Sequence, residues 1–233
     1  MSKKQKLRPV GNRTNSMLRR DLYRLFRTPL LYWFVGFAAL LPGSFTVMTD
    51  PDFQNGFDAW GQVGSLFSSA LFVMTGIFLA FFIGNDYKSG FIKNVCSITP
   101  KHRAFTFAKV ITGAVAGIMM ILSYVLGAAI FGAAAGGEFT ASGFGEMLAG
   151  AVGKSALMLM FCGMYACVDV LLRNHVWFAV CGSVAVGVLF LPAMMITLGS
   201  AYTMAGLSIA AGLICLAIFP RVAAFIMKQR DIL

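Results

Sequence analysis

Six long apolar runs, separated by short segments that carry the charges, constrain this chain more than any other feature. A helix needs about 20 apolar residues to cross the ~30 Å hydrocarbon core of a bilayer. Hydrophobic residues make up 58% of the chain and charged residues only 12%, whereas soluble domains are ~45–50% apolar. We therefore expect an all-α integral membrane protein with six transmembrane helices. The runs are residues 30–48, 64–84, 108–134, 149–168, 176–195 and 201–219.

The fifth and sixth runs are nearly fused. Only the segment ITLGS separates them, and it contains no charged residue that would mark a turn. Pro192, Gly199 and Gly206 are the expected break points, because proline and glycine interrupt helices. Full spans and short re-entrant helices are both compatible with this pattern.

The basic residues are distributed unequally between the two sides of the predicted bundle. With alternating spans, 18 of the 19 Lys and Arg residues fall on one side, and Lys154 is the exception. Lys and Arg are retained in cytoplasmic loops. Both termini are therefore expected in the cytoplasm, and the protein is expected to be a multi-pass protein of the cell membrane, a bacterial cytoplasmic membrane. Because the basic residues cluster between spans, no nucleic-acid partner is predicted.

Two segments precede the first span. Residues 1–12 form a basic tail, which we expect to be disordered and attracted to anionic lipid headgroups. Residues 13–29 predict an amphipathic helix on the inner membrane surface, ended by Pro29. A stop-transfer flank with helical periodicity by chance is the alternative. The apolar positions are Leu18, Leu22, Leu25 and Phe26, and the basic positions are Arg19, Arg20, Arg24 and Arg27.

The connector between the second and third spans, residues 85–107, mixes charged and apolar side chains. Tyr87, Phe91 and Ile92 lie beside Asp, Lys and Asn residues. A short amphipathic helix that inserts into a cytoplasmic partner needs such a mixture. Contact of the apolar residues with lipid is the competing interpretation.

The stretch GAVGKS in the fourth run looks like the end of a phosphate-binding loop. That motif requires a glycine five residues before GKS and a preceding buried strand, but Leu148 occupies the glycine position and the segment lies in an outer span end. Gly150 and Gly153 are better explained by close helix packing, with Lys154 reaching the outer headgroups. A third interpretation places Lys154 in an inner cavity, on a substrate path with Glu138, or facing Glu146 or an anionic substrate group.

The sequence contains few residues that indicate a catalytic or metal-binding site. The chain has two histidines, both outside the predicted spans, and five cysteines without a C-x-x-C pair. Ser155 adjoins Lys154, but neighbouring helical residues point ~100° apart and do not meet easily. We therefore predict no catalytic residue, no metal site and no cofactor bound by this chain.

A loose pattern in and after the connector resembles a known family. An acidic residue is followed by Gly, Lys-Asn, P-x-x-R and a Lys at the third span, here Asp86, Gly90, Lys93, Asn94, Pro100, Arg103 and Lys109. With the C-terminal FIMKQRDIL and the six-span plan, the whole chain resembles the permease subunit of type-2 ABC transporters, in the exporter group. Many relatives carry Glu and Gly-Thr where this chain has Asp86 and Gly90-Phe91.

The resemblance implies three regions of contact. The connector would hold a short cytoplasmic coupling helix that docks on a separate cytosolic ABC ATPase, which would bind ATP and Mg²⁺. Residues 13–29 would be the elbow helix beside it, and the turn after the fourth span would make a smaller contact. The implied residues are Asp86, Tyr87, Lys88, Gly90, Phe91, Ile92, Lys93, Asn94 and Arg103 in the connector, and Asp169, Arg173, Asn174 and His175 in the turn.

The implied function is a permease subunit of an ATP-driven exporter. It would move an amphipathic peptide, drug or lipid out of the cytoplasm, paired with a second copy or a homologous permease. A non-transporting membrane scaffold or immunity protein, which binds a peptide or partner in the bilayer, is the alternative. The two differ in whether a cytosolic ATPase is required.

Overall fold

The computed structural model describes residues 10–49, 58–89, 102–134, 141–172, 175–197 and 201–230. Throughout these ranges the regular structure is α-helical, as the apolar runs predict. The helices are α1 (Val10–Arg27), α2 (Pro29–Thr49), α3 (Asp58–Lys88), α5 (His102–Ala134), α6 (Ala141–Leu171), α7 (Val176–Thr197) and α8 (Ala201–Arg230).

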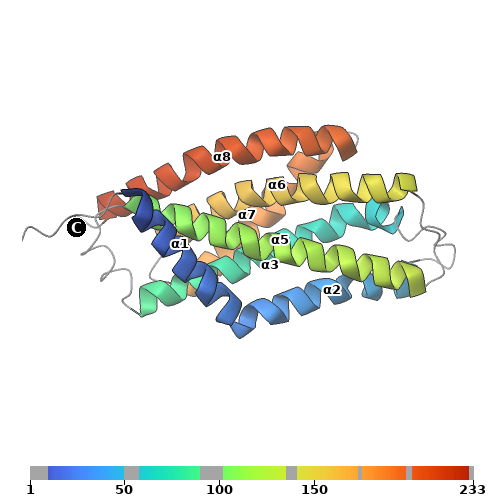
Figure 1. Cartoon of the computed structure of the whole chain (residues 1–233), viewed down its shortest axis with the longest axis horizontal. Coiled ribbons are helices and arrows are strands. Elements are labelled where there is room, and N and C mark those ends of the chain that lie inside the picture. The colour runs from blue at the N-terminus through green and yellow to red at the C-terminus, as the bar shows by residue number, and fades with distance from the viewer. Residues whose placement is uncertain are drawn as a thin grey trace, which may run out of the picture.

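Three helices form the centre of the bundle. Helices α3, α5 and α6 pack against one another, and each pair of them is partly covered by an outer helix. Helix α2 lies on α5 and α3, α7 lies on α3 and α6, and α8 lies on α6 and α5 (Figure 1). The short helix α1 packs mainly on α5.

One end of the bundle, which we call the basic end, gathers several helix termini. Helix α1, the last turns of α3, α6 and α8, and the first turns of α5 and α7 all lie there (Figure 1). This agrees with the alternation of spans inferred from the charges. Which membrane face the basic end occupies, and hence where the termini lie, stays a prediction.

Four helices of the described chain are long and apolar enough to cross a membrane. These candidate spans are Ala70–Lys88, Ala104–Phe131, Met147–Leu171 and Gly206–Met227. The pair α1 and α2, bent by 64° at its break, gives up to a fifth span. The apolar stretch Val176–Leu189 of α7 is shorter than a span. Each predicted apolar run lies within one helix, but six complete spans stay a prediction.

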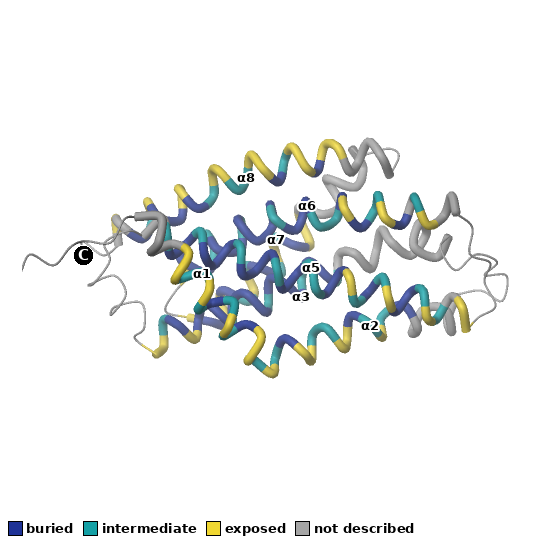
Figure 2. Tube along the Cα trace, viewed as in Figure 1, coloured by how far each residue is buried: buried dark blue, intermediate teal, exposed yellow. Residues whose placement is uncertain are grey.

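The bundle buries aromatic residues at its centre and exposes many apolar side chains on its outside. Phe72 of α3 packs on Phe161 of α6 with ring centroids 4.9 Å apart, and both are buried. Helix α8 presents Leu213, Ile214 and Ile218 outward, and the outer faces of α2 and α8 are largely exposed in Figure 2. An apolar outer surface of this kind suits a lipid environment.

Glycines permit close helix contacts at two seams. A Cβ on Gly127 of α5 would overlap the carbonyl oxygen of Ala39 in α2. A Cβ on Gly212 of α8 would lie 2.5 Å from the carbonyl oxygen of Ala156 in α6. Small residues let backbones approach in membrane bundles, so both outer helices depend on glycine for their position.

Helix α1 begins at Val10, earlier than the expected boundary at residue 13. Asn15 and Ser16, which can cap a helix, lie inside it and are exposed. The overlooked signal is Pro9, since proline is common where helices begin. The chain then turns at Thr28, whose hydroxyl donates to the Arg24 carbonyl at 2.8 Å, and α2 starts at Pro29.

Candidate functional site

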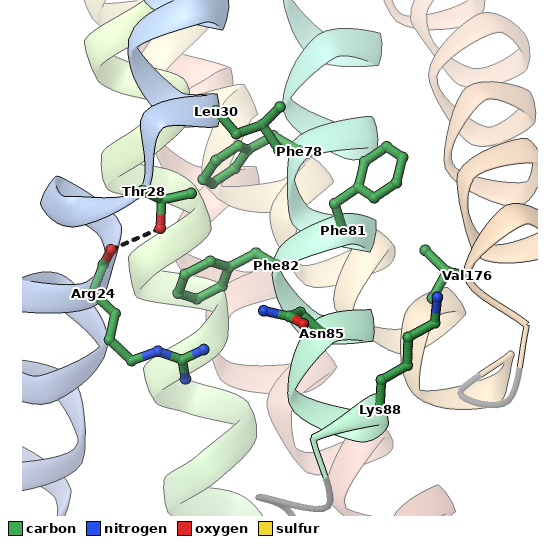
Figure 3. A pocket seen from close by; sticks show the side chains of 9 residues that line it. All are labelled: Arg24, Thr28, Leu30, Phe78, Phe81, Phe82, Asn85, Lys88 and Val176. Carbon is green, nitrogen blue, oxygen red and sulfur yellow. Dashed lines mark hydrogen bonds between the residues drawn. The ribbon is translucent and has the colours of Figure 1, made fainter.

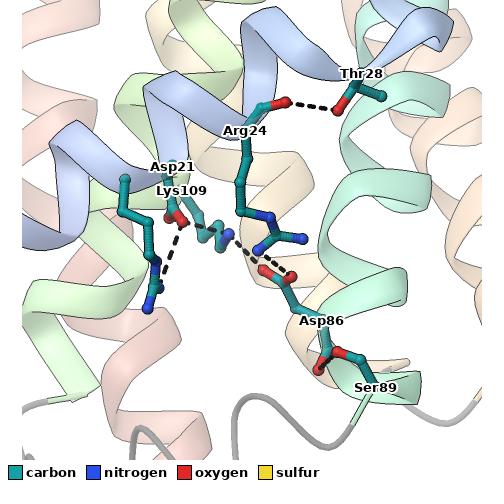
Figure 4. A network of polar contacts seen from close by, with 7 residues as sticks. Asp21, Arg24, Thr28, Asp86, Ser89 and Lys109 are labelled. Atoms are coloured by element: carbon teal, nitrogen blue, oxygen red, sulfur yellow. Dashed lines mark hydrogen bonds and ion pairs between the residues drawn. The ribbon is translucent and has the colours of Figure 1, made fainter.

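Buried charged side chains from three helices meet at the basic end. Asp21 and Arg24 come from α1, Asp86 from the last turn of α3, and Lys109 from the second turn of α5 (Figure 4). We call these four residues the buried ion cluster. Asp21 and Lys109 are each 1% exposed and Asp86 is 0% exposed, whereas Arg24 reaches the surface with 33% of its side chain exposed.

Lys109 is the centre of the cluster. Its Nζ lies 3.0 Å from Oδ2 of Asp21 and 2.5 Å from Oδ2 of Asp86. The other oxygen of Asp86 lies 2.6 Å from a guanidinium nitrogen of Arg24. Arg20, on the rim, approaches Oδ1 of Asp21 at 3.6 Å. The two carboxylates are thus matched by two close cations, and α1, α3 and α5 are joined through one lysine.

Helical periodicity explains how Asp21 reaches the interior. Asp21 follows Leu18 by three residues and precedes Leu25 by four, so the three share a face of α1. Leu25 is fully buried in the main core, and this face packs toward α5. Asp21 is therefore carried inward with the apolar residues and meets Lys109 there.

Two aromatic rings also lie close to the ammonium group of Lys109. The Nζ of Lys109 lies 4.5 Å from the ring centroid of Phe82 and 5.3 Å from that of Phe105. Arg24 also lies over Phe82, with Cζ 5.5 Å from the centroid. Cations near aromatic faces gain roughly 0.5–2 kcal/mol, so Phe82 supports both cations of the cluster.

The cluster is costly to disrupt. Removing one member of a buried ion pair leaves an uncompensated charge and typically destabilises a protein by about 3–5 kcal/mol. Because the three helices share these charges, a movement of α3 that kept the pairs intact would carry α1 and α5 with it. The cluster therefore ties the positions of α1, α3 and α5 to one another.

The connector starts directly at this cluster. Helix α3 continues through Lys88 and α5 begins at His102. The connector between the helices is therefore shorter than the predicted loop 85–107. Asp86 faces inward, Tyr87 is half-buried and packs against the core, and Lys88 is exposed. The side chain of Arg103 and residues Gly90, Phe91, Ile92, Lys93 and Asn94 lie outside the described part of the chain.

The four residues of the predicted second contact do not lie together in one exposed turn. Asp169, expected in a turn, lies instead within α6 and is buried, because α6 extends to Leu171. Its Oδ1 accepts a hydrogen bond of 3.5 Å from the Ser183 hydroxyl of α7. His175 is exposed and packs edge-on against Phe178. Arg173 and Asn174 lie outside the described residues.

The proposed elbow helix is only partly oriented as expected. Leu25 is buried and Leu22 packs against the core, while Leu18 is half-buried. Phe26 and Arg19 are exposed. Part of the apolar side of α1 therefore packs on the bundle, mainly on α5.

Lys154 lies well inside α6, which begins at Ala141 rather than near residue 149. Its side chain is half-buried. At 1.5 Å per residue, it lies roughly 10 Å into the candidate span Met147–Leu171. Glu138, its predicted companion on a substrate path, lies outside the described residues.

The buried ion pair between Asp21 and Lys109 was not predicted from the sequence. Asp21 was not singled out, and Lys109 was noted only as part of a pattern. The available signals were an acidic residue on the apolar face of an amphipathic helix and a lysine at the start of an apolar run. Among the described residues, no group of three His, Cys, Asp or Glu side chains could hold a metal ion.

Comparison with known families adds an independent observation. Residues 22–190, more than two thirds of the chain, match the family described as ABC-2 family transporter protein. The chain belongs to the ABC-2 transporter family. This confirms the resemblance drawn from the connector, and the match spans α1 from Leu22 through most of α7. A search of curated proteins found no match.

Membership in the ABC-2 family fixes the general class of this molecule. With several apolar helices, it is a multi-pass membrane protein and a transporter permease. ABC-2 permeases work with an ABC ATPase subunit, so pairing with such a subunit is implied. The buried ion cluster falls at the part of this permease where the chain leaves α3.

Proposed function

We propose that this ABC-2 permease is an export subunit that receives movement from a cytosolic ATPase through the segment between α3 and α5. That segment would dock on the ATPase as a coupling helix, with the residues that follow Lys88 at the contact. A second copy, or a homologous permease, would complete the route. The cargo would be an amphipathic peptide, drug or lipid, moved outward.

The observation that carries the proposal is the buried ion cluster. Asp86 lies four residues before the undescribed segment begins, and its carboxylate faces both Arg24 and Lys109. A force applied to the connector would therefore reach α1 and α5 as well as α3. In this proposal Asp86 anchors the connector, and it does not itself touch the ATPase.

The family of the chain supports the partner, and the apolar exterior supports the type of cargo. Export direction follows from the resemblance to exporter permeases. The outer faces of α2, α7 and α8 are apolar, which leaves a wide surface for lipid or for a second permease. Recognition of an amphipathic cargo within or beside the bilayer is consistent with these faces.

Co-purification with an ABC ATPase encoded beside the permease gene tests the proposal. We expect the wild-type chain to retain the ATPase in detergent and Phe91→Asp to lose it. Arg221→Asp, an exposed change on α8 at the same end, should retain it. Retention by Phe91→Asp would place the contact elsewhere. Function of the permease in cells without the ATPase would favour a scaffold or immunity role.

A further inference from the structure

A pocket at the basic end lies between the bend of α1 and α2, the last turns of α3 and the start of α7. It has a volume of about 260 Å³. That is slightly below the ~300–1,000 Å³ of sites for drug-sized ligands, so it suits a headgroup-sized fragment. Its described lining residues are Arg24, Thr28, Leu30, Phe78, Phe81, Phe82, Asn85, Lys88 and Val176.

The lining changes from apolar to cationic along α3. Phe78, Phe81 and Phe82 lie within three turns before Asn85 and Lys88, on the same side of the helix. In Figure 3, Leu30, Phe78 and Phe81 lie toward one side, and Arg24, Asn85 and Lys88 lie toward the other. The apolar part points toward the middle of the bundle and the polar part toward the basic end. An amphiphile would be oriented by this gradient.

The charge of the pocket selects an anion. Of its nine described lining residues two are cationic and none is acidic. Arg24 is already paired with Asp86. Lys88 is exposed, and no carboxylate of the described residues lies within ion-pair distance of it. The Asn85 side chain adds an amide donor.

Exposed aromatic residues place the pocket at headgroup depth. Trp177, at the start of α7, is 73% exposed and packs edge-on against Phe81, with centroids 5.9 Å apart. Trp33 of α2 is 78% exposed, and the nearby Tyr32 hydroxyl donates to the Phe26 carbonyl at 2.7 Å. Trp and Tyr gather where a membrane meets water.

We propose that this pocket binds the headgroup of an anionic phospholipid. Lys88 and the Asn85 amide contact the phosphate, and Arg24 contributes positive potential. The upper part of the acyl chains lies against Leu30 and Phe81, which are half-buried. The site lies next to the buried ion cluster, but lipid binding needs no ATPase and is independent of the proposed transport function.

The test compares two lipids with identical acyl chains, phosphatidylglycerol and phosphatidylcholine, on the full chain in detergent. Native mass spectrometry gives the affinity of the first bound lipid. We expect phosphatidylglycerol to bind more tightly. Lys88→Gln should weaken its binding about tenfold or more, the value of a hydrogen bond to a charged group, and Lys88→Arg should restore most of it.

Arg221→Gln is the matched control, because Arg221 is also exposed at the basic end but lies on α8, outside the pocket. A change of less than about threefold in the phosphatidylglycerol affinity of Arg221→Gln supports a specific site. Equal losses in Arg221→Gln and Lys88→Gln would reduce the effect to general surface charge and overturn the proposal. It is also overturned if Lys88→Gln binds phosphatidylglycerol normally, or if inorganic phosphate displaces the lipid.

Discussion

Lys109 Nζ lies 3.0 Å from Asp21 Oδ2, although one residue belongs to an α-helix before the first predicted span and the other to the third. Both side chains are 1% exposed. The pair fixes α1 onto α5, and Asp86 extends the same contact to α3. The helix predicted to lie along the inner membrane surface is therefore also joined to the bundle by a buried ion pair.

Lys109→Met tests the contribution of this lysine to stability. Methionine preserves much of the apolar stem, but it leaves Asp21 and Asp86 without their shared cation. We expect a loss of about 3–5 kcal/mol in the free energy of unfolding, measured as a lower thermal unfolding temperature in detergent. Lys88→Met, an exposed lysine at the same end, should change the temperature little.

The double variant Lys109→Met with Asp21→Asn separates charge from packing. If the loss arises from an uncompensated carboxylate, removing that carboxylate should recover part of the stability, because one fewer buried charge remains. A double variant no more stable than Lys109→Met would contradict this, because the uncompensated carboxylate would then not be the source of the loss.

Two glycines of α8 give a matched pair. A Cβ on Gly212 would lie 2.5 Å from the Ala156 carbonyl oxygen, whereas nothing lies within 4 Å of a Cβ on Gly206. Gly212→Ala must push α8 from α6 and should cost about 1–3 kcal/mol. Gly206→Ala should be neutral or stabilising, since alanine favours a helix interior. Opposite shifts in thermal unfolding temperature are expected, and equal shifts would contradict the close seam.

Orientation in the membrane is tested with thiol labelling. A variant that keeps only Cys96, in the connector, should resist a membrane-impermeant maleimide in intact cells and react in inverted vesicles. A single-cysteine variant Ser142→Cys, in the first turn of α6 at the opposite end, should show the reverse. Labelling of Cys96 in intact cells would place the connector outside and remove the proposed ATPase contact.

Local sequence patterns predicted the helices well because apolar runs are long and each crosses the bundle once. Residues 108–134, for example, lie entirely within α5. The family resemblance implied that Asp86 and Asp169 contact an ATPase, which requires accessible side chains, but both are buried. Their burial depends on cations and hydroxyls supplied by other helices. Periodicity places Asp21 on the apolar face of α1, but its pairing with Lys109 depends on how α1 packs on α5, which the pattern of one helix does not reveal.

Asp86 and Asp169 allow one comparison between two buried carboxylates with different surroundings. Asp86 faces Arg24 and Lys109, whereas Oδ1 of Asp169 is 3.5 Å from the Ser183 hydroxyl and has no cationic partner among the described residues. Asp86→Asn removes the counter-charge of two cations and should destabilise the protein by several kcal/mol, about 3–5.

Asp169→Asn removes a carboxylate that no cation among the described residues neutralises, and its amide still reaches Ser183. We expect thermal unfolding within a few degrees of the wild type, or at higher temperature, because an amide costs less than an unpaired charge to bury. Both variants replace one atom and keep the side-chain volume, so a difference between them reports the electrostatic surroundings. A loss in Asp169→Asn as large as in Asp86→Asn would mean that a cation not described here also neutralises Asp169.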